Sequence, residues 1–296
     1  MKKRFLVFPL IVLLIISCFV YINRSHIGYF EYLYKHTTDK EVYTMEEKLL
    51  IILEKDPENL FKEFSLELDR SPKSQNVCHG IAHKLGHESF ELYGLETSMD
   101  IAKPICGGGF IHGVLESMFG TFVDGEDLLD ELADICQAQD ESCNHGLGHG
   151  LMVVTNNDFR KSLSYCDLLD SMAHSDCYDG VFMHIFDNEE TGISKDIKER
   201  YEAEKLCNNS EERYQKSCAF YLPRIFVGED EIGIKSYYTC MKVNEYARIS
   251  CFFGSGTMFG KYIYDDHDKA KQNCDIFGDD KWACIQGVNH YIEDVF

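Results

Sequence analysis

A short phrase of cysteine, glycine and histidine recurs along this chain of 296 residues and constrains its fold more than any other feature. The clearest copy runs from Cys143 to Gly150, where His149 stands three residues after Gly146. Related segments, spaced 28 to 41 residues apart, begin at Cys78, Cys106, Cys177, Cys218, Cys251 and Cys284. Recurrence at this period is typical of helical-hairpin repeats. The sequence therefore predicts an all-α fold of about seven hairpins, arranged as an α/α toroid or an open superhelical solenoid.

Each predicted hairpin pairs a polar amphipathic helix with a more apolar helix that contains glycine. The apolar helices are expected to begin at the cysteines named above and to form the inner layer. Glycine lets a neighbouring backbone or a ligand approach closely, and tight helix packing alone explains these glycines equally well. No alternating pattern of the kind that strands show is present. The polar helices are expected over residues 124–136, 158–166, 195–207, 231–241 and 267–274.

The 13 cysteines divide into pairs, which favours a disulfide framework. Zinc binding is the alternative, but zinc sites usually have two to four residues between paired cysteines, whereas the gaps here are six to ten. Each short loop stabilises the fold by roughly 3 kcal/mol on the chain-entropy model. Disulfides also imply an oxidising compartment. Five pairs are close in sequence, and setting them and Cys18 aside leaves a sixth: Cys136 with Cys143, Cys166 with Cys177, Cys207 with Cys218, Cys240 with Cys251, Cys274 with Cys284, and Cys78 with Cys106.

The N-terminal segment has the pattern of a membrane-targeting element. A basic tip over residues 1–4 precedes an apolar run over residues 5–22, which is long enough to span a bilayer as a helix. The basic tip is expected to stay in the cytoplasm and the rest of the chain to lie on the extracytoplasmic side. Two alternatives stay open: an uncleaved signal anchor, or a lipoprotein signal in which Cys18 is acylated. Both make the membrane a partner of this chain.

A linker over residues 23–43 is expected to lead into an extracytoplasmic helical repeat domain over residues 44–296. Helical periodicity begins over residues 44–55, and Asp56-Pro57 is typical of the start of a second helix that continues to about residue 68. The formal net charge of −21 repels phosphate backbones, so no nucleic-acid partner is expected.

Histidines concentrate in the predicted inner helices, at spacings that place them on one helix face. His145 and His149 are four residues apart, as are His112 and Glu116. In a toroid, equivalent positions of this kind converge on the central cavity. Imidazole is the commonest side-chain metal ligand and suits zinc, copper and iron. The sequence therefore predicts a transition-metal site whose ligands come from six histidines: His83, His87, His112, His149, His184 and His290.

Three further residues are expected to take a catalytic role, as proton-transfer groups or additional ligands: Glu116, His79 and His145. The structural alternative is that repeat duplication copied a hydrogen-bonded core histidine. A purely structural histidine should be needed in every repeat, whereas a site needs only some repeats. Other residues stand at the equivalent places of the fifth and sixth repeats, which favours a site: Tyr221, Arg224, Gly254 and Thr257.

The Cys78-His79-Gly80 triplet and the Gly-x-x-His-Gly phrases resemble segments of the lanthionine-cyclase α/α toroids. That family uses free cysteines as zinc ligands, whereas the cysteines of this chain are expected to pair. No activity is inferred from the resemblance.

Two functions are compatible with these patterns, and the sequence leaves open whether the protein is an enzyme. Neither the H-E-x-x-H motif nor the G-x-S-x-G motif is present. The first function is a membrane-anchored extracytoplasmic protein with a histidine-lined central metal site, either a metal-dependent hydrolase or a redox enzyme. The second is a non-enzymatic repeat scaffold whose concave surface binds a protein or peptide.

Overall fold

The computed structural model describes residues 40–70, 77–122, 136, 141–186, 203–226, 233–263 and 266–295. The chain forms two compact units, Met1–Tyr43 and Thr44–Phe296. The predicted membrane segment over residues 5–22, with Cys18, lies outside the described residues. Among the helices that are described, none combines the length and the apolar character needed to cross a bilayer.

Throughout its described part the second unit is built from helices without a strand, which confirms the predicted all-α class. The two helices predicted ahead of the repeats are present. The helices, including the short 3-10 turns η1, η3, η6 and η7, are α3 (Lys40–Lys55), η1 (Pro57–Asn59), α4 (Leu60–Arg70), α5 (Cys78–Ile101), η3 (Ile105–Gly108), α6 (Gly109–Phe119), α8 (Glu141–Val154), α9 (Phe159–Cys166), α10 (His174–Phe186), α11 (Glu204–Asn208), α12 (Glu212–Tyr221), η6 (Leu222–Phe226), α13 (Ile234–Cys240), α14 (Glu245–Tyr262), α15 (His267–Gln272), η7 (Asn273–Asp280) and α16 (Lys281–Val295).

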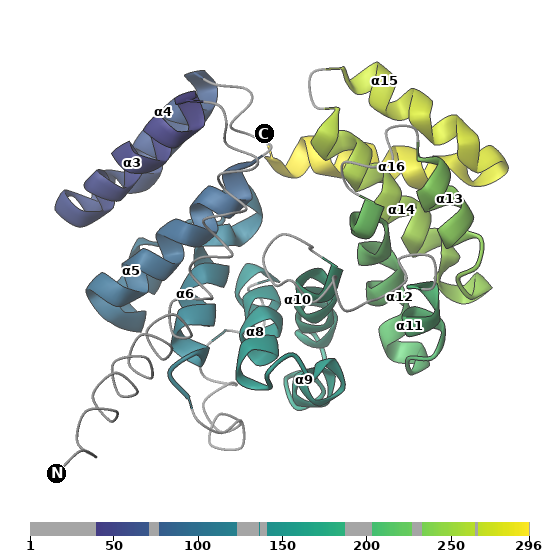
Figure 1. Ribbon diagram of the computed structural model, residues 1–296, viewed down its shortest axis with the longest axis horizontal. Helices are drawn as coiled ribbons and strands as arrows, with labels where there is room; N and C mark the ends of the chain where they lie inside the picture. Colours follow the sequence, from purple (N-terminus) through teal and green to yellow (C-terminus); the bar gives the residue numbers. More distant parts are fainter. Residues whose placement is uncertain are drawn as a thin grey trace, which may run out of the picture. The chain divides into compact units, whose positions relative to one another are not determined.

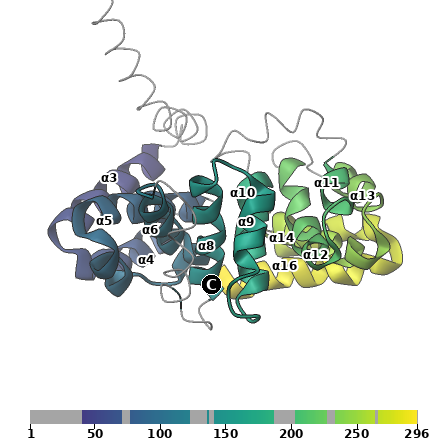
Figure 2. The same cartoon turned by 90° about the horizontal axis from the view of Figure 1, so that it is seen from below.

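The helices that carry the cysteine and glycine phrases pack against one another in chain order. Helix α5 packs on α6, α6 on α8, α8 on α10, α10 on α12, α12 on α14, and α14 on α16 (Figures 1 and 2). The last helix, α16, also contacts η3, which leads into α6. The short polar helices pack on their hairpin partners, as α9 does on both α8 and α10. Buried side chains from these helices, between Ile111 in α6 and Val288 in α16, form one hydrophobic cluster.

Glycine lets these neighbouring helices approach closely. A Cβ atom added at Gly113 in α6 would collide with the carbonyl oxygen of His83 in α5. A Cβ atom at Gly180 in α10 would collide with the carbonyl oxygen of His145 in α8. Each contact lies beside a histidine of the predicted site, so close packing and site assembly use the same helix faces.

All six predicted cysteine pairs form disulfides, from Cys78–Cys106 to Cys274–Cys284. Cys166–Cys177 joins the end of α9 to α10, and Cys240–Cys251 joins the end of α13 to α14 in the same way. Apart from Cys106, the disulfide-bonded cysteines are buried, and the bonds from Cys166, Cys207 and Cys240 each fix a short polar helix onto an inner helix inside the core. The disulfide interpretation is therefore confirmed, and the zinc alternative for these cysteines is excluded.

The starts of the inner helices differ from the prediction that each begins at its cysteine. Only α5 begins at its cysteine, whereas α12 begins at Glu212, ahead of Cys218, and α14 begins at Glu245, ahead of Cys251. Helix α6 deviates in the other direction, because η3 precedes it and contains Cys106. The added first turns carry acidic residues, which the positive end of the helix dipole favours.

Candidate metal centre

The carboxylate of Glu116 lies at the centre of a buried histidine cluster. Its Oε1 atom lies 3.2 Å from Nδ1 of His149, 3.4 Å from Nε2 of His83 and 3.7 Å from Nδ1 of His184. Its Oε2 atom lies 3.4 Å from Nε2 of His87. In the described part of the chain, no lysine or arginine forms an ion pair with this carboxylate. Histidines from three helices therefore surround a carboxylate that has no lysine or arginine partner among the described residues.

The side chains fall into three groups that can each hold a metal ion. We name them site 1 (His83, His87 and Glu116), site 2 (Glu116, His149 and His184) and site 3 (His112, His145 and His149). Within each site the donor atoms lie within 4.8 Å of one another. Sites 1 and 2 share Glu116, and sites 2 and 3 share His149.

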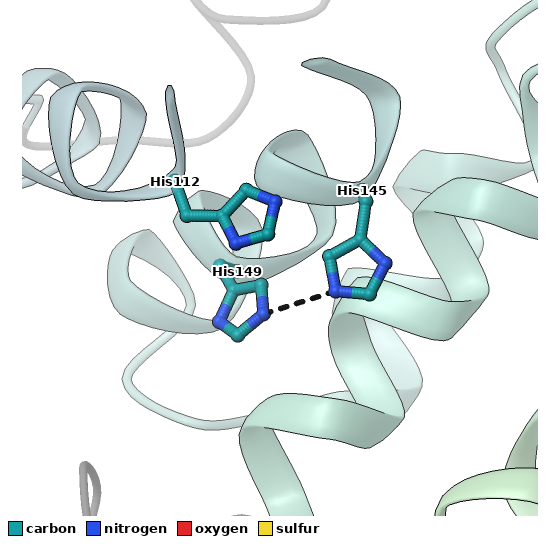
Figure 3. Close-up of side chains that lie close together, drawn as sticks. All are labelled: His112, His145 and His149. Carbon is teal, nitrogen blue, oxygen red and sulfur yellow. Dashed lines mark hydrogen bonds between the residues drawn. The ribbon is translucent and has the colours of Figure 1, made fainter. Parts of the chain in front are cut away.

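Helical spacing explains how these groups form. His145 and His149 are four residues apart on α8, and His112 and Glu116 are four residues apart on α6. Each pair therefore lies on one helix face. Helix α5 adds His83 and His87, and helix α10 adds His184. Figure 3 shows the rings of His112, His145 and His149 directed toward one another.

The cluster is removed from water. His149 is 0% exposed and His112 is 2% exposed, whereas the side chain of His87 is 37% exposed and forms the outer edge of the cluster. Burying polar groups is costly unless a partner compensates them. A core that served packing alone would gain stability from apolar side chains at these positions and would avoid the cost of desolvating the rings.

Burial keeps His112, His145 and His149 neutral. Desolvation lowers the pKa of His149 to about 4, although the nearby Glu116 carboxylate opposes this shift. Desolvation, together with the neighbouring histidines, also lowers the pKa values of His112 and His145 well below the usual value. At Glu116, burial alone would raise the pKa, but contacts with His83 and the other histidines hold it well below the usual value. Neutral imidazole and ionised carboxylate are the forms that bind metal ions.

Several donor atoms lack the hydrogen bonds that buried groups normally make. Both ring nitrogens of His112 are buried, and neither has a hydrogen-bond partner among the described residues. Nδ1 of His149 lies close to Oε1 of Glu116, yet neither atom forms a hydrogen bond with the described residues. Unsatisfied buried groups in native proteins call for an explanation, and a bound ion is one. This donor set fits a transition metal, because histidine nitrogen and carboxylate oxygen both suit zinc, copper and iron.

Supporting hydrogen bonds orient two of the rings. Oγ of Ser117 lies 2.6 Å from Nδ1 of His87, which leaves Nε2 of that ring directed at Glu116. Nε2 of His145 lies 3.2 Å from Sδ of Met183, a buried thioether. Outer partners of this kind fix the orientation of metal-binding rings.

A cavity of about 390 Å³ adjoins site 3, and His112 and His145 form part of its wall. Residues from the first and the last hairpins line it together, including His79 near the start of α5 and Tyr291 in α16. Arg224 and Lys261 also line the cavity, and Glu141 is the one acidic residue that does so among those the structure describes. The lining is therefore cationic in a chain whose net charge is −21.

The structure brings together five of the six histidines predicted as ligands, all except His290. His290 is an exposed residue of the cavity wall, and its ring packs 5.5 Å from the ring of Phe253. Glu116 and His145, expected in catalytic roles, lie among the donor groups. His79 belongs to none of the three sites. Its Nδ1 donates to the carbonyl oxygen of Cys106 at 2.8 Å.

Sequence reasoning missed two residues of the cavity wall as functional candidates. Arg224 was identified only as a residue that replaces histidine in its repeat, and its guanidinium packs 4.9 Å from the ring of Tyr221. Lys261 stands beyond the recurring phrase of α14, so no local pattern marks it.

No protein-family model, no curated protein and no solved structure matches this chain significantly.

Proposed function

We propose that this protein binds a transition-metal ion, zinc, copper or iron, in the buried histidine and glutamate cluster and uses it as a metalloenzyme. The observation that carries the proposal is site 3, where the buried His112 and His149 meet the partly buried His145 at the wall of a cavity. A catalytic zinc site typically has three protein ligands and one position left for water or substrate. Site 3 has this composition, and the cavity lies where the free position is needed.

The residues divide the work as follows in this proposal. His112, His145 and His149 hold the ion, with Met183 beside His145 as a further soft donor that suits copper. When bound, the ion supplies Lewis acidity for hydrolysis or an electron for redox chemistry. His79 offers Nε2 as a proton acceptor, because its Nδ1 donates to the carbonyl oxygen of Cys106. His290 contributes to the cavity wall and is not a ligand.

The cavity accepts a small anionic ligand in this proposal. Arg224 and Lys261 supply positive charge on the wall, and Tyr221 and Tyr291 supply aromatic surface. A few polar groups within an otherwise apolar wall are typical of small-molecule sites. An anionic group held by the two cations would leave the rest of the ligand to extend toward His112 and His145.

We further propose that the hairpins close into an α/α toroid of repeats around this cavity. Support comes from the contact of α16 with η3 and from a wall that residues of the first and last hairpins share. The segment over residues 5–22 anchors the domain to the membrane, on its extracytoplasmic side. The six disulfides are consistent with that oxidising location.

Elemental analysis of the purified full-length protein tests the metal proposal. We expect stoichiometric zinc, copper or iron, either as isolated or after chelation and reloading. His112→Ala and His145→Ala should each reduce the metal content, whereas His267→Ala, in a helix outside all three sites, should leave it unchanged. Absence of stoichiometric metal before and after reloading would overturn the proposal. It would leave the binding scaffold, with a protein or peptide partner, as the function to pursue.

A further inference from the structure

We infer that sites 2 and 3 bind two metal ions at the same time and that the imidazole ring of His149 bridges the two ions. This inference rests on the proposed metal-binding function and adds a second ion and a shared ligand to it. It gives the protein a dinuclear centre in which one ion faces the cavity and the other lies deeper.

The two nitrogens of His149 face different sets of donors. Its Nδ1 lies 3.2 Å from Oε1 of Glu116, in site 2. Its Nε2 lies 3.3 Å from Nε2 of His145, in site 3. Figure 3 shows this second contact as the dashed line between the two rings. Because the lone pairs of the two nitrogens point away from each other, a single ion cannot use both of them.

The separations fit two coordination shells. With metal–ligand bonds of about 2.0–2.1 Å, two ligands of one tetrahedral ion lie about 3.3 Å apart. The contact from His149 to His145 measures 3.3 Å, and the contact from His149 to Glu116 measures 3.2 Å. His184 lies 3.7 Å from the same oxygen of Glu116, so a small adjustment brings it into the shell of site 2.

Packing holds the bridging ring in place. His149 is 0% exposed, and its ring stacks on the ring of His112 with centroids 5.1 Å apart and an interplanar angle of 17°. The ring of His184 also contacts it in a T-shaped arrangement, with centroids 5.5 Å apart. A ring confined in this way keeps Nδ1 toward site 2 and Nε2 toward site 3.

The two ions have different surroundings. His112 and His145 of site 3 line the cavity, so an ion there can meet a ligand. Glu116 and His184 of site 2 do not line it, and His184 is 5% exposed. Site 3 is therefore the reactive position, and the ion of site 2 polarises the shared ring and fixes its orientation.

Bridging requires a defined change in protonation. A neutral imidazole carries one N–H proton, and metal binding at both nitrogens requires that this proton leave. Two metal–nitrogen bonds then replace one metal–nitrogen bond and one N–H bond, and one proton passes to the solvent. Binding of the second ion should therefore release about one proton per chain that the first ion does not release from His149.

Copper titration of the metal-free full-length protein tests the inference, with Cu²⁺ as the probe. We expect two or more Cu²⁺ ions per chain. We also expect the integrated electron paramagnetic resonance intensity at low temperature to account for far fewer spins than the number of bound copper ions, because an imidazole bridge couples the spins of the two ions. His184→Ala should lose one ion and leave the site 3 ion with its full, uncoupled signal. His145→Ala should likewise lose one ion, this time from site 3. His149→Gln should abolish the coupling.

The outcomes separate this inference from the proposed function. One Cu²⁺ ion per chain, or two ions with full uncoupled signal, overturns the bridge and leaves the metal-binding proposal standing. Binding of no copper, zinc or iron overturns both. Circular dichroism of each variant checks that it folds, and the wild-type stoichiometry and signal decide the question even where a variant does not fold.

Discussion

The first half of the domain, helices α5 to α10, and the second half, helices α11 to α16, share a packing scheme. They differ in the side chains that face inward. Helix α10 in the first half and α14 in the second each carry a disulfide to the preceding polar helix. In each, a glycine lies against a carbonyl oxygen of the inner helix before it: Gly180 against His145, and Gly254 against Phe220. Cysteine and glycine are therefore requirements of the scaffold in both halves.

The polar side chains of the two halves behave differently. In α14, the hydroxyl of Ser255 donates to the carbonyl oxygen of Cys251 at 3.0 Å, and Thr257 donates to Gly254 at 2.7 Å. In α6, by contrast, both ring nitrogens of His112 lack a hydrogen-bond partner among the described residues. The buried hydroxyls of α14 are therefore satisfied by backbone carbonyls of their own helix, whereas the buried ring nitrogens of His112 in α6 are not satisfied by the described residues. This contrast favours a site over duplicated core histidines.

The largest effect is expected from filling the glycine contacts, which should harm both halves alike. Gly180→Leu and Gly254→Leu each force a side chain into a neighbouring backbone carbonyl. Each should lower the free energy of unfolding by about 3 kcal/mol, at the upper end of the usual cost of overpacking. Urea unfolding followed by circular dichroism measures this. A large loss of unfolding free energy in one variant and none in the other would contradict a packing scheme common to both halves.

Acidification should destabilise the metal-free protein because it protonates the buried histidines of the first half, such as His149. Burial lowers the pKa of His149 to about 4, whereas a histidine in the unfolded chain titrates near 6.5. The unfolded state therefore takes up a proton first, and stability falls as the pH drops from about 6.5 to about 4. The contribution of this residue to the loss approaches about 3 kcal/mol.

Urea unfolding at a series of pH values measures this loss. His149→Gln should flatten the curve over that interval, and bound metal should oppose the loss because it competes with protons for the ring. A wild-type curve that stays flat between these pH values contradicts the neutral buried state of His149.

A smaller effect is expected from the hydroxyl that orients His87. Ser117→Ala removes the 2.6 Å contact with Nδ1 of that ring, so an ion held at site 1 should bind roughly 10–100-fold more weakly, whereas ions at sites 2 and 3, to which His87 does not belong, should bind as before. Ser255→Ala in the second half is the matched control, because it removes a buried hydroxyl that touches no site residue. Competition with a chelator of known affinity gives both values. Equal losses of affinity in the two variants would show a general loosening of the fold.

The smallest effect is expected at His290 in the second half. His290→Ala should leave the number of bound ions unchanged, since the residue lies outside all three sites. Elemental analysis beside the wild-type protein checks this. Loss of an ion in this variant would show that the cavity wall supplies a ligand and that the two halves share the site.

The sequence predicted those features that depend on local spacing. Short cysteine separations predicted five disulfides and elimination predicted the sixth, Cys78–Cys106, while the four-residue spacing of His112 and Glu116 placed both on one face of α6. The sharing of His149 between two sites depends on how α6, α8 and α10 cross, which local periodicity does not encode. The separation of His290 from the cluster has the same origin. An exposed position near the end of α16 satisfies the repeat spacing without entering any of the three donor groups.

The most direct test of the central claim is anomalous X-ray diffraction at the zinc edge from crystals of the zinc-loaded protein. Our account predicts strong anomalous density on both sides of the His149 ring, one peak toward Glu116 and His184 and the other toward His112 and His145. Density on one side only would remove the bridge. Absence of density on both sides, with zinc present in the crystal, would contradict the metal centre itself.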